Sequence, residues 1–201
     1  MKVLHATDLH FNKNACEWLT VNQACADVVC LTGDFLDTRI DAAEPPELQV
    51  LFFLKWFQSF SRPLLVCSGN HDVSYREGSW LNNEGVKDVY GDGAKVRLNG
   101  ITFGCVPYVG NLDVYRECDV LLHHEPPARS KTAVQDGIDY GCTSLSYALT
   151  HKTLLAKYVL CGHVHRPSKS AVRKGNCIVI NAGGTHSQTQ ASHALIEVDE
   201  K

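Results

Sequence analysis

Five short apolar runs recur along this 201-residue chain, and polar side chains able to bind metal follow each of them. Apart from Lys2 at the start of the first run, the runs carry no charged residue, which is typical of strands buried on both faces of a sheet. Helical patterns fall between some of the runs, a strong one over Pro46–Phe60 and a weaker one over Ser144–Ala156. The predicted buried strands are Lys2–Ala6, Val28–Thr32, Pro63–Cys67, Val120–Leu122 and Tyr158–Cys161.

Further strands are predicted from turn chemistry. Asn99-Gly100 between two alternating segments predicts a hairpin with a type I′ turn. Long polar segments at 73–94 and 126–143 are expected to be loops that form the walls of a site. With no internal repeat or long linker, residues 1–201 are expected to form one mixed α/β domain. The additional strands are Lys95–Leu98 with Ile101–Phe103, Ser170–Val172 with Cys177–Asn181, and Ala194–Val198.

Composition and charge exclude several classes of protein. The chain is 44% hydrophobic and 20% charged, which argues against a disordered or coiled-coil protein. A formal net charge of −3 gives no sign of a basic face for nucleic acid. No run approaches the ~18 apolar residues of a membrane span, and no signal peptide is evident, so we expect no membrane partner and a cytoplasmic location. The nine cysteines, odd in number and without C-x-x-C spacing, are expected to be small core residues.

The residues after the apolar runs indicate a metal site. In open α/β sheets, ligands bind beyond the carboxyl ends of the strands, so five strand ends would bring their polar groups to one rim. Residues i and i+2 of an extended segment point the same way, which lets Asp8 and His10 converge, as well as His163 and His165. The groups are Asp8 and His10; Asp34 and Asp37; Asn70, His71 and Asp72; His123 and His124; and His163 and His165.

Seven ligands in this set are too many for one tetrahedral zinc ion and suit two ions that share a bridge. Carboxylate, amide and imidazole donors favour Mn, Fe, Zn or Ni over calcium, and manganese is the favoured ion. Two divalent ions would leave the site electropositive, and paired ions can activate a water and hold phosphoryl oxygens. We therefore expect a phosphoester substrate. Of the adjacent histidines, His123 is preferred to His124 as the ligand because it directly follows the apolar run.

The ordered motifs DLH, GDFLD, GNHD, LLHH and GHVH, spread over residues 8–165, resemble the signature of the calcineurin-like metallophosphoesterases. The resemblance implies a four-layer αββα sandwich of two mixed β-sheets flanked by helices, with a dinuclear metal centre. It implies that His71 is not a ligand but protonates the leaving oxygen, while Asp37 orients its imidazole. It also implies one ion on Asp8, His10 and His165, the other on Asn70, His123 and His163, and Asp34 as the bridge.

Physical chemistry supports the acid role, because a histidine that titrates near neutral pH is a suitable proton donor at pH 7. The substrate class is less constrained. The segments GDFLDTR and GNHD depart from the GDxVDRG and GNHE typical of the family's protein phosphatases, whereas His123–Pro127 resembles the HHxP segment of small phosphodiesterases. A phosphodiester, either a small molecule or a nucleotide, is therefore favoured. The alternatives are a phosphomonoesterase or protein phosphatase, a nuclease that the charge does not support, and a non-catalytic interaction scaffold.

Four more residues near the motifs have simpler interpretations. Arg39, Arg76 and Arg166 could steady a phosphate through two parallel hydrogen bonds, but a surface role is the preferred interpretation for each. His186, which follows Asn181-Ala182-Gly183-Gly184, is expected to be an ordinary loop histidine. The sequence does not indicate the oligomeric state.

Overall fold

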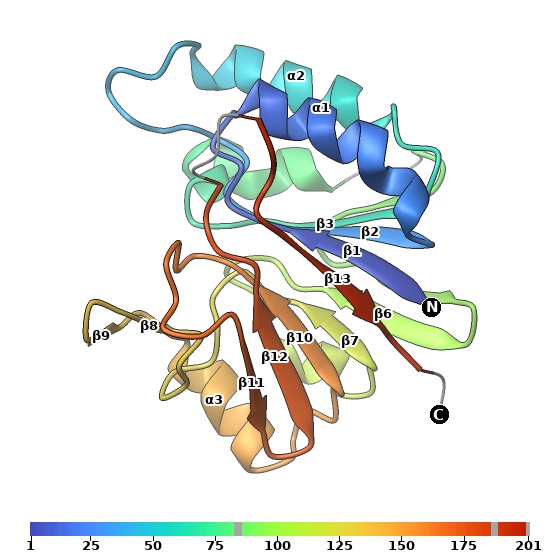
Figure 1. The fold of residues 1–201 in the computed structure, drawn as a ribbon, viewed down its shortest axis with the longest axis vertical. Helices are drawn as coiled ribbons and strands as arrows, with labels where there is room; N and C mark the ends of the chain where they lie inside the picture. The colour runs from blue at the N-terminus through green and yellow to red at the C-terminus, as the bar shows by residue number, and fades with distance from the viewer. Residues whose placement is uncertain (83–85, 186–188, 200–201) are drawn as a thin grey trace.

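Two β-sheets lie face to face at the centre of the computed structural model, which describes residues 1–82, 86–185 and 189–199 (Figure 1). The first sheet has the order β13-β1-β2-β3-β4; β1 to β4 are parallel, and β13 runs antiparallel to β1. Its strands are β1 (Lys2–Ala6), β2 (Val28–Thr32), β3 (Leu64–Cys67), β4 (Val89–Tyr90) and β13 (His193–Glu197).

The second sheet has the order β11-β12-β10-β7-β6-β5, with parallel central strands and antiparallel edge strands. A separate ribbon pairs β8 (Val134–Gln135) with β9 (Ile138–Asp139). The strands of the second sheet are β5 (Lys95–Leu98), β6 (Ile101–Cys105), β7 (Val120–Leu122), β10 (Tyr158–Cys161), β11 (Ala171–Lys174) and β12 (Cys177–Asn181).

Helices cover the outer faces of both sheets. Helices α1 (Lys13–Asn22) and α2 (Pro46–Phe57) pack on the first sheet, and α3 (Thr143–Thr150) packs on the second (Figure 1). The order helix, sheet, sheet, helix confirms the predicted four-layer αββα sandwich. Short 3-10 helices occupy Gln23–Cys25, Asp72–Ser74, Arg76–Leu81 and Leu112–Tyr115.

Burial on both faces explains the uninterrupted apolar runs. Along β2, Val29 and Leu31 join the core beneath α1 and α2, whereas Val28 and Cys30 join the core between the sheets. Successive side chains of a strand point to opposite faces, so a strand with apolar layers on both sides needs apolar residues at every position. All five predicted buried strands are present; Pro63 alone lies outside its strand.

The turn and helix predictions are confirmed with shifted boundaries. Asn99 and Gly100 have φ of 45° and 81°, the pair of positive values that a type I′ turn needs. Helix α2 ends at Phe57 rather than at Phe60, and α3 ends at Thr150, six residues before the predicted Ala156. The remaining predicted strands differ from the observed ones by at most two residues at either end.

Three features were not predicted. Helix α1 was missed, although Asn12 caps it by accepting a hydrogen bond from Ala15 N at 3.1 Å. The segment 126–143, predicted to be a loop, contains the β8–β9 ribbon. The segment 73–94 contains 3-10 turns and β4 in its described part.

The cysteines and the helices agree with the compositional expectations. All nine cysteines are free, and seven of them are buried. Among the residues that the structure describes, no helix combines the length and the apolar character needed to cross a bilayer.

Candidate metal centre

Loops from both sheets meet at the carboxyl ends of their parallel strands and bring seven polar side chains together. Three of the contributing loops follow β1, β2 and β3 of the first sheet; two follow β7 and β10 of the second. We call the seven residues the ligand cluster: Asp8, His10, Asp34, Asn70, His124, His163 and His165.

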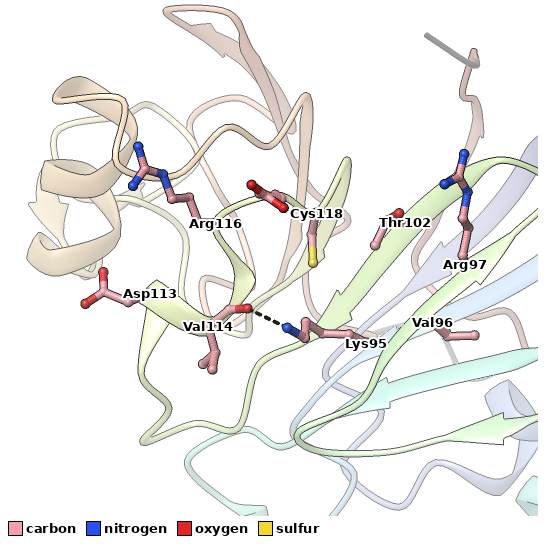
Figure 2. Close-up of a pocket in the computed structure, with 9 residues that line it drawn as sticks. Lys95, Val96, Arg97, Thr102, Asp113, Val114, Arg116 and Cys118 are labelled. Atoms are coloured by element: carbon pink, nitrogen blue, oxygen red, sulfur yellow. Dashed lines mark hydrogen bonds between the residues drawn. The ribbon is translucent and has the colours of Figure 1, made fainter.

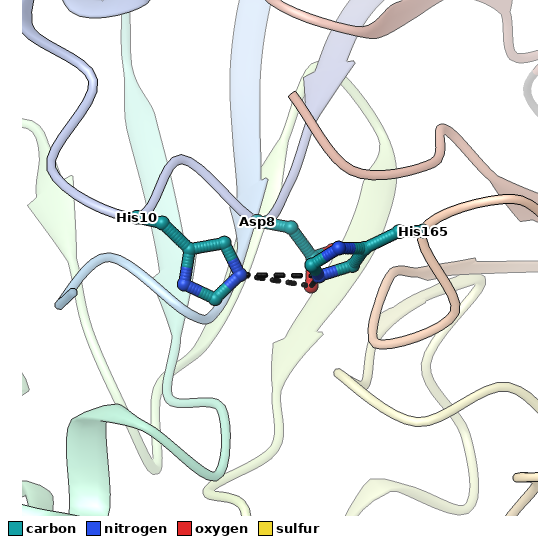
Figure 3. A group of neighbouring side chains, drawn as sticks. All are labelled: Asp8, His10 and His165. Carbon is teal, nitrogen blue, oxygen red and sulfur yellow. Dashed lines mark hydrogen bonds and ion pairs between the residues drawn. The ribbon is translucent and has the colours of Figure 1, made fainter. Parts of the chain in front are cut away.

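One half of the ligand cluster is formed by Asp8, His10 and His165 (Figure 3). His165 Nε2 lies 3.2 Å from Asp8 Oδ1 and 3.1 Å from His10 Nε2. His10 Nε2 is 3.9 Å from the same Asp8 oxygen. The three groups thus direct one oxygen and two imidazole nitrogens at a common point.

The other half centres on the amide oxygen of Asn70. Asn70 Oδ1 lies 2.9 Å from His163 Nδ1 and 3.2 Å from His124 Nε2. His124 Nε2 is also 3.3 Å from Asp34 Oδ2. These four residues come from the loops after β2, β3, β7 and β10, so this half joins the two sheets.

Asp34 connects the two halves. Its Oδ2 is within 4.0 Å of Nε2 of three histidines: 3.3 Å from His124, 3.8 Å from His71 and 4.0 Å from His10. Its other oxygen, Oδ1, accepts a hydrogen bond from the backbone N–H of His71 at 2.9 Å. One carboxylate oxygen therefore fixes the side chain, and the other faces both groups of donors.

Strained backbone holds several of these side chains in place. Asp8, His10, Asp34 and His163 all have φ between 42° and 65°, the left-handed region that costs about 1–2 kcal/mol for a residue with a Cβ atom. Hydrogen bonds between the loops maintain this conformation: Asp8 N donates to Gly33 O, and His10 N donates to Asp34 O, both at 3.0 Å. Strain concentrated at one site indicates a function that requires this geometry.

Two glycines permit the close approach of the loops. A Cβ atom at Gly162 would lie 1.8 Å from Thr7 Oγ1 and 2.2 Å from Asp8 Oδ2. A Cβ atom at Gly69 would lie 2.2 Å from Asp34 Oδ1. Any larger residue at either position would displace a carboxylate of the ligand cluster.

The pKa values reflect how the buried carboxylates and histidines act on one another. Burial opposes the charge of His124, yet Asp34 and Asp8 raise its pKa to about 10. Burial also opposes the charge of Asp34, but His124 holds the pKa of that carboxyl below its usual range. Burial, together with His124, lowers the pKa of His163 to about 4. The two carboxylates thus attract positive charge, which protons or bound cations can supply.

The donor chemistry fits divalent cations. Asp8 and Asp34 are 0% and 2% exposed, and the ion-pair partners that the described residues offer them are histidines. Buried carboxylates require such compensation. His124 Nδ1 donates to Thr32 O at 2.7 Å and His10 Nδ1 contacts Leu36 O at 3.2 Å, which leaves each Nε2 available as a ligand. Carboxylate, amide and imidazole donors of this kind suit Mn, Fe, Zn or Ni.

The structure places the adjacent histidines differently from the prediction. His123 lies outside the ligand cluster, and its Nδ1 donates to the backbone oxygen of Glu125 at 2.8 Å. His124 lies among the other donors instead. The alternation along β7 explains this: Leu121 faces α3, whereas Leu122 faces the space between the sheets, and His124 shares the face of Leu122. Following the alternation of side chains from Leu122 would have pointed to His124 as the histidine that faces the other donors.

The structure also corrects the predicted partner of His71. Asp37 pairs with Arg39, whose Nε and Nη2 donate to its two oxygens at 2.9 and 2.7 Å. Thr38 Oγ1 is the group in hydrogen-bond contact with His71 Nδ1. The ring of His71 packs edge-on against that of His10, with centroids 4.8 Å apart, and its side chain is 31% exposed. His71 therefore lies beside the ligand cluster and reaches solvent.

Other residues near the motifs have structural roles. Asp72 is buried and accepts backbone hydrogen bonds from Phe35, Leu36 and Gly69, so it ties the loop after β2 to the loop after β3. Thr7 Oγ1 lies 2.6 Å from Asp8 Oδ2, a contact that none of the motifs predicted. His186 lies outside the described residues.

Two pockets open onto the ligand cluster and share His165. The first, about 590 Å³, also contains His10, Phe11, Arg39 and His71, and we call it the His71 pocket. The second, about 570 Å³, lies against the β8–β9 ribbon, and we call it the ribbon pocket. The ribbon pocket is lined by Gln135, Tyr140, His163, Val164, His165 and Arg166.

A third pocket, about 520 Å³, contains none of the predicted site residues (Figure 2). It lies along β5 and β6, where Lys95 Nζ donates to the backbone oxygen of Val114 at 3.0 Å. Arg97 and Arg116 line it together with Asp113 and Glu117, so its charges are mixed. It offers no cluster of metal donors and is not the candidate site.

The sequence and the fold are both similar to those of known proteins. The sequence model of the calcineurin-like phosphoesterase family matches residues 1–167. The fold resembles TT1561 of Thermus thermophilus, with a TM-score of 0.65 and 13% identity over 94% of this chain and 90% of that chain. It also resembles an archaeal phosphodiesterase, with a TM-score of 0.53 and 14% identity over 98% of this chain and 100% of the other. GAP50, described as the anchor in the inner membrane complex of Plasmodium, gives a TM-score of 0.58 at 10% identity, covering 91% and 71% of the respective chains.

Proposed function

The chain belongs to the calcineurin-like phosphoesterases, a family of metal-dependent hydrolases, and on that premise we propose that it hydrolyses a phosphodiester with two divalent cations. The position of Asp34 Oδ2 carries the proposal. This oxygen faces histidine nitrogens from three loops, at distances of 3.3–4.0 Å. A carboxylate shared between two groups of donors suits a pair of ions held close together.

The ligand cluster divides into two sets. Asp8, His10 and His165 would hold one ion, and Asn70, His124 and His163 the other, with Asp34 shared between them. When bound, such ions polarise phosphoryl oxygens and lower the pKa of a coordinated water. Manganese is our favoured ion among Mn, Fe, Zn and Ni, because the set contains oxygen donors and lacks thiolates.

His71 is the proposed proton donor to the leaving oxygen. It is partly exposed, lines the His71 pocket and lies beside the ligand cluster. Thr38, through its contact with Nδ1, would fix the orientation of the ring and leave Nε2 directed at the cluster. A positioned acid of this kind contributes about 10²–10⁴-fold to a rate.

The two pockets favour a diester over a monoester. A phosphodiester carries two ester arms, and the His71 pocket and the ribbon pocket both begin at His165. A monoester would use one of them. The free cysteines, most of them buried, are consistent with the reducing cytoplasm that we propose as the compartment.

Substrate assays test the proposal directly. Hydrolysis of bis(4-nitrophenyl) phosphate and of 4-nitrophenyl phosphate is compared with Mn²⁺, Ni²⁺, Zn²⁺ and Fe²⁺. We expect turnover that depends on the metal and a higher kcat/KM for the diester. A preference for the monoester would overturn the diester assignment, and metal-loaded protein that hydrolyses neither compound would overturn the proposed activity.

The His71→Ala variant tests the assigned acid. We expect it to retain both metal ions and to lose about 10²–10⁴-fold in kcat on a diester with a poor leaving group. Elemental analysis of the purified variant measures the metal content. Loss of one equivalent would identify His71 as a ligand, and full turnover would remove it from the mechanism.

A further inference from the structure

The ribbon pocket has a composition distinct from that of the His71 pocket. An aromatic side chain, Tyr140, an apolar side chain, Val164, and a guanidinium, Arg166, line it together with two histidines of the ligand cluster. Tyr140 is 45% exposed, and the side chain of Arg166 is 73% exposed. Tyrosine rings and guanidinium groups both stack on planar ligands, so this wall suits a flat ring.

The walls of the ribbon pocket are tied together by hydrogen bonds. Arg166 N donates to Gln135 Oε1 at 2.9 Å, and Ser168 N donates to Val134 O at 2.8 Å. Tyr140 N donates to Ala133 O at 2.9 Å, across the base of the ribbon. The ribbon, which projects from the body of the molecule (Figure 1), is therefore anchored to the segment that carries His163 and His165, and a ligand would meet a preformed wall.

The Arg166 guanidinium is available for such a ligand. Its ion pair with Asp136 is long, at 4.0 Å, and the Asp136 side chain is 78% exposed. Exposed pairs of this kind contribute little to stability, so their replacement by a ligand contact costs little. Val164, by contrast, is buried and forms a fixed apolar floor.

The location of His71 determines which ester arm each pocket would take. His71 lines the His71 pocket and is absent from the lining of the ribbon pocket. The arm whose oxygen receives the proton must lie near His71, so the arm in the ribbon pocket is the one that stays on phosphorus. This assignment rests on the proposed function.

We infer that the ribbon pocket is the subsite for the non-leaving arm of a small phosphodiester, and that this arm carries a planar aromatic or heterocyclic ring. A water oxygen bonds to phosphorus, and the bond from phosphorus to the leaving oxygen breaks. The leaving oxygen takes a proton from His71 and departs as an alcohol from the His71 pocket. The water loses one proton, and solvent restores that of His71. The remaining phosphomonoester keeps its ring against Tyr140 and Arg166.

Two substrates with the same leaving group test the inference. Bis(4-nitrophenyl) phosphate and methyl 4-nitrophenyl phosphate both release nitrophenolate, and they differ only in the arm that stays. Because a nitrophenyl ester also makes phosphorus more reactive than a methyl ester does, each kcat/KM is divided by the uncatalysed rate constant of the same compound. We expect this normalised value to favour the aryl arm about tenfold or more, as expected for a stacked ring. Tyr140→Ala and Arg166→Ala should raise KM for the aryl compound more than for the methyl compound and so lower the aryl-to-methyl ratio of kcat/KM, while Tyr140→Phe should retain the preference.

Matched controls come from elsewhere on the surface. Tyr147→Ala on α3 and Arg97→Ala in the pocket of Figure 2 should leave the aryl-to-methyl ratio unchanged. If Tyr140→Ala and Arg166→Ala leave the aryl-to-methyl ratio unchanged, the inference is wrong. It is also wrong if the control variants change this ratio by the same amount. Faster cleavage of a single-stranded oligonucleotide than of a dinucleotide would indicate that the substrate is a nucleic acid and not a small diester, and this result would also overturn the inference.

A binding measurement separates this inference from the proposed activity. Calorimetry with phenyl phosphate and methyl phosphate on the metal-loaded protein requires no turnover. Tighter binding of phenyl phosphate that is lost in Tyr140→Ala supports the subsite even if the assays detect no hydrolysis. Equal binding of the two compounds overturns the subsite, whatever the assays give for the proposed function.

Discussion

Thr38 contacts His71, the residue that we propose as the general acid, whereas the neighbouring carboxylate of Asp37 does not. The Asp37 carboxylate is held by Arg39 through two hydrogen bonds, and the Thr38 hydroxyl contacts His71 Nδ1. Thr38→Val should therefore lower kcat by about 5- to 10-fold, the value of one hydrogen bond of about 1 kcal/mol. Thr38→Ser should keep most of the activity, because it keeps the hydroxyl.

A double-mutant cycle checks this prediction. If Thr38 acts through His71, Thr38→Val should cause no further loss in a His71→Ala background. Kinetics of the wild type and of Thr38→Val with phenyl and 4-nitrophenyl leaving groups provide a second measurement, because the loss caused by Thr38→Val should be larger for the poorer leaving group. Independent, additive losses would show that Thr38 does not position His71.

The adjacent histidines give a second prediction at this scale. His124→Ala should lose about one equivalent of metal, because His124 Nε2 lies 3.3 Å from Asp34 Oδ2 and 3.2 Å from Asn70 Oδ1. His123→Ala is the matched control and should keep two equivalents, since its ring contacts the backbone of Glu125. Elemental analysis after gel filtration measures both. If only the His123→Ala variant loses metal, His123 is the ligand, as the sequence predicts.

These residues also show what the sequence can and cannot predict about the site. Motif spacing placed six of the seven predicted ligands in the cluster, since each follows a buried strand within four residues of its end. The prediction favours His123 because it directly follows the strand. In the structure, the alternation of side chains along the strand directs His124, and not His123, to the cluster. The error at Asp37 has a different cause: whether a carboxylate contacts histidine or arginine depends on side-chain geometry that no spacing encodes.

At the scale of elements, strands were easier to predict than helices. The buried strands lie between two apolar layers, so their sequences are apolar throughout. Helix α1 buries only Ala15, Cys16 and Leu19, a narrow stripe that resembles loop sequence. The β8–β9 ribbon has two residues in each strand and no buried face, so its sequence carries no periodic signal.

Asn181, at the end of β12, holds the loop that presents His163 and His165. Its side chain is fully buried; Nδ2 lies 2.9 Å from Gly162 O and 3.1 Å from Val164 O, and Oδ1 accepts from Gly183 N at 2.8 Å. Asn181→Ala removes the hydrogen bonds of Val164 O and Gly183 N, which are buried backbone groups, at a cost of about 1–3 kcal/mol for each group. Gly162 O keeps its hydrogen bond from Val164 N at 2.7 Å. We expect a lower free energy of unfolding and faster hydrogen exchange in the segment 162–166.

Asn176→Ala provides the control for this element. Asn176 is exposed in the turn between β11 and β12, and its replacement should change stability by less than about 0.5 kcal/mol. Urea denaturation measures the free energies, and exchange detected by mass spectrometry locates the opening. If both variants exchange alike in the segment 162–166, Asn181 does not hold that loop.

At the scale of the whole molecule, the ligand cluster joins the two halves of the sandwich. Asp8, Asp34 and Asn70 belong to loops of the first sheet, and His124 and His163 to loops of the second. Ions bound to both sets would oppose separation of the sheets. Because a ligand that binds only the folded state stabilises it, free metal at about 1,000 times Kd should add about 4 kcal/mol to the free energy of unfolding for each site that it fills.

Removal of metal should therefore lower Tm of the whole protein in a single transition. Chelation by EDTA, followed by calorimetry with and without added Mn²⁺, measures the shift. His71→Ala should show the same shift as wild-type protein, because His71 is assigned to proton transfer and not to metal binding. His124→Ala should show a smaller one, since it lacks a ligand from the second sheet. A Tm independent of metal in all three proteins would mean that the cluster does not bind ions across the two sheets, and the assignment of Asp34 as their bridge would fail with it.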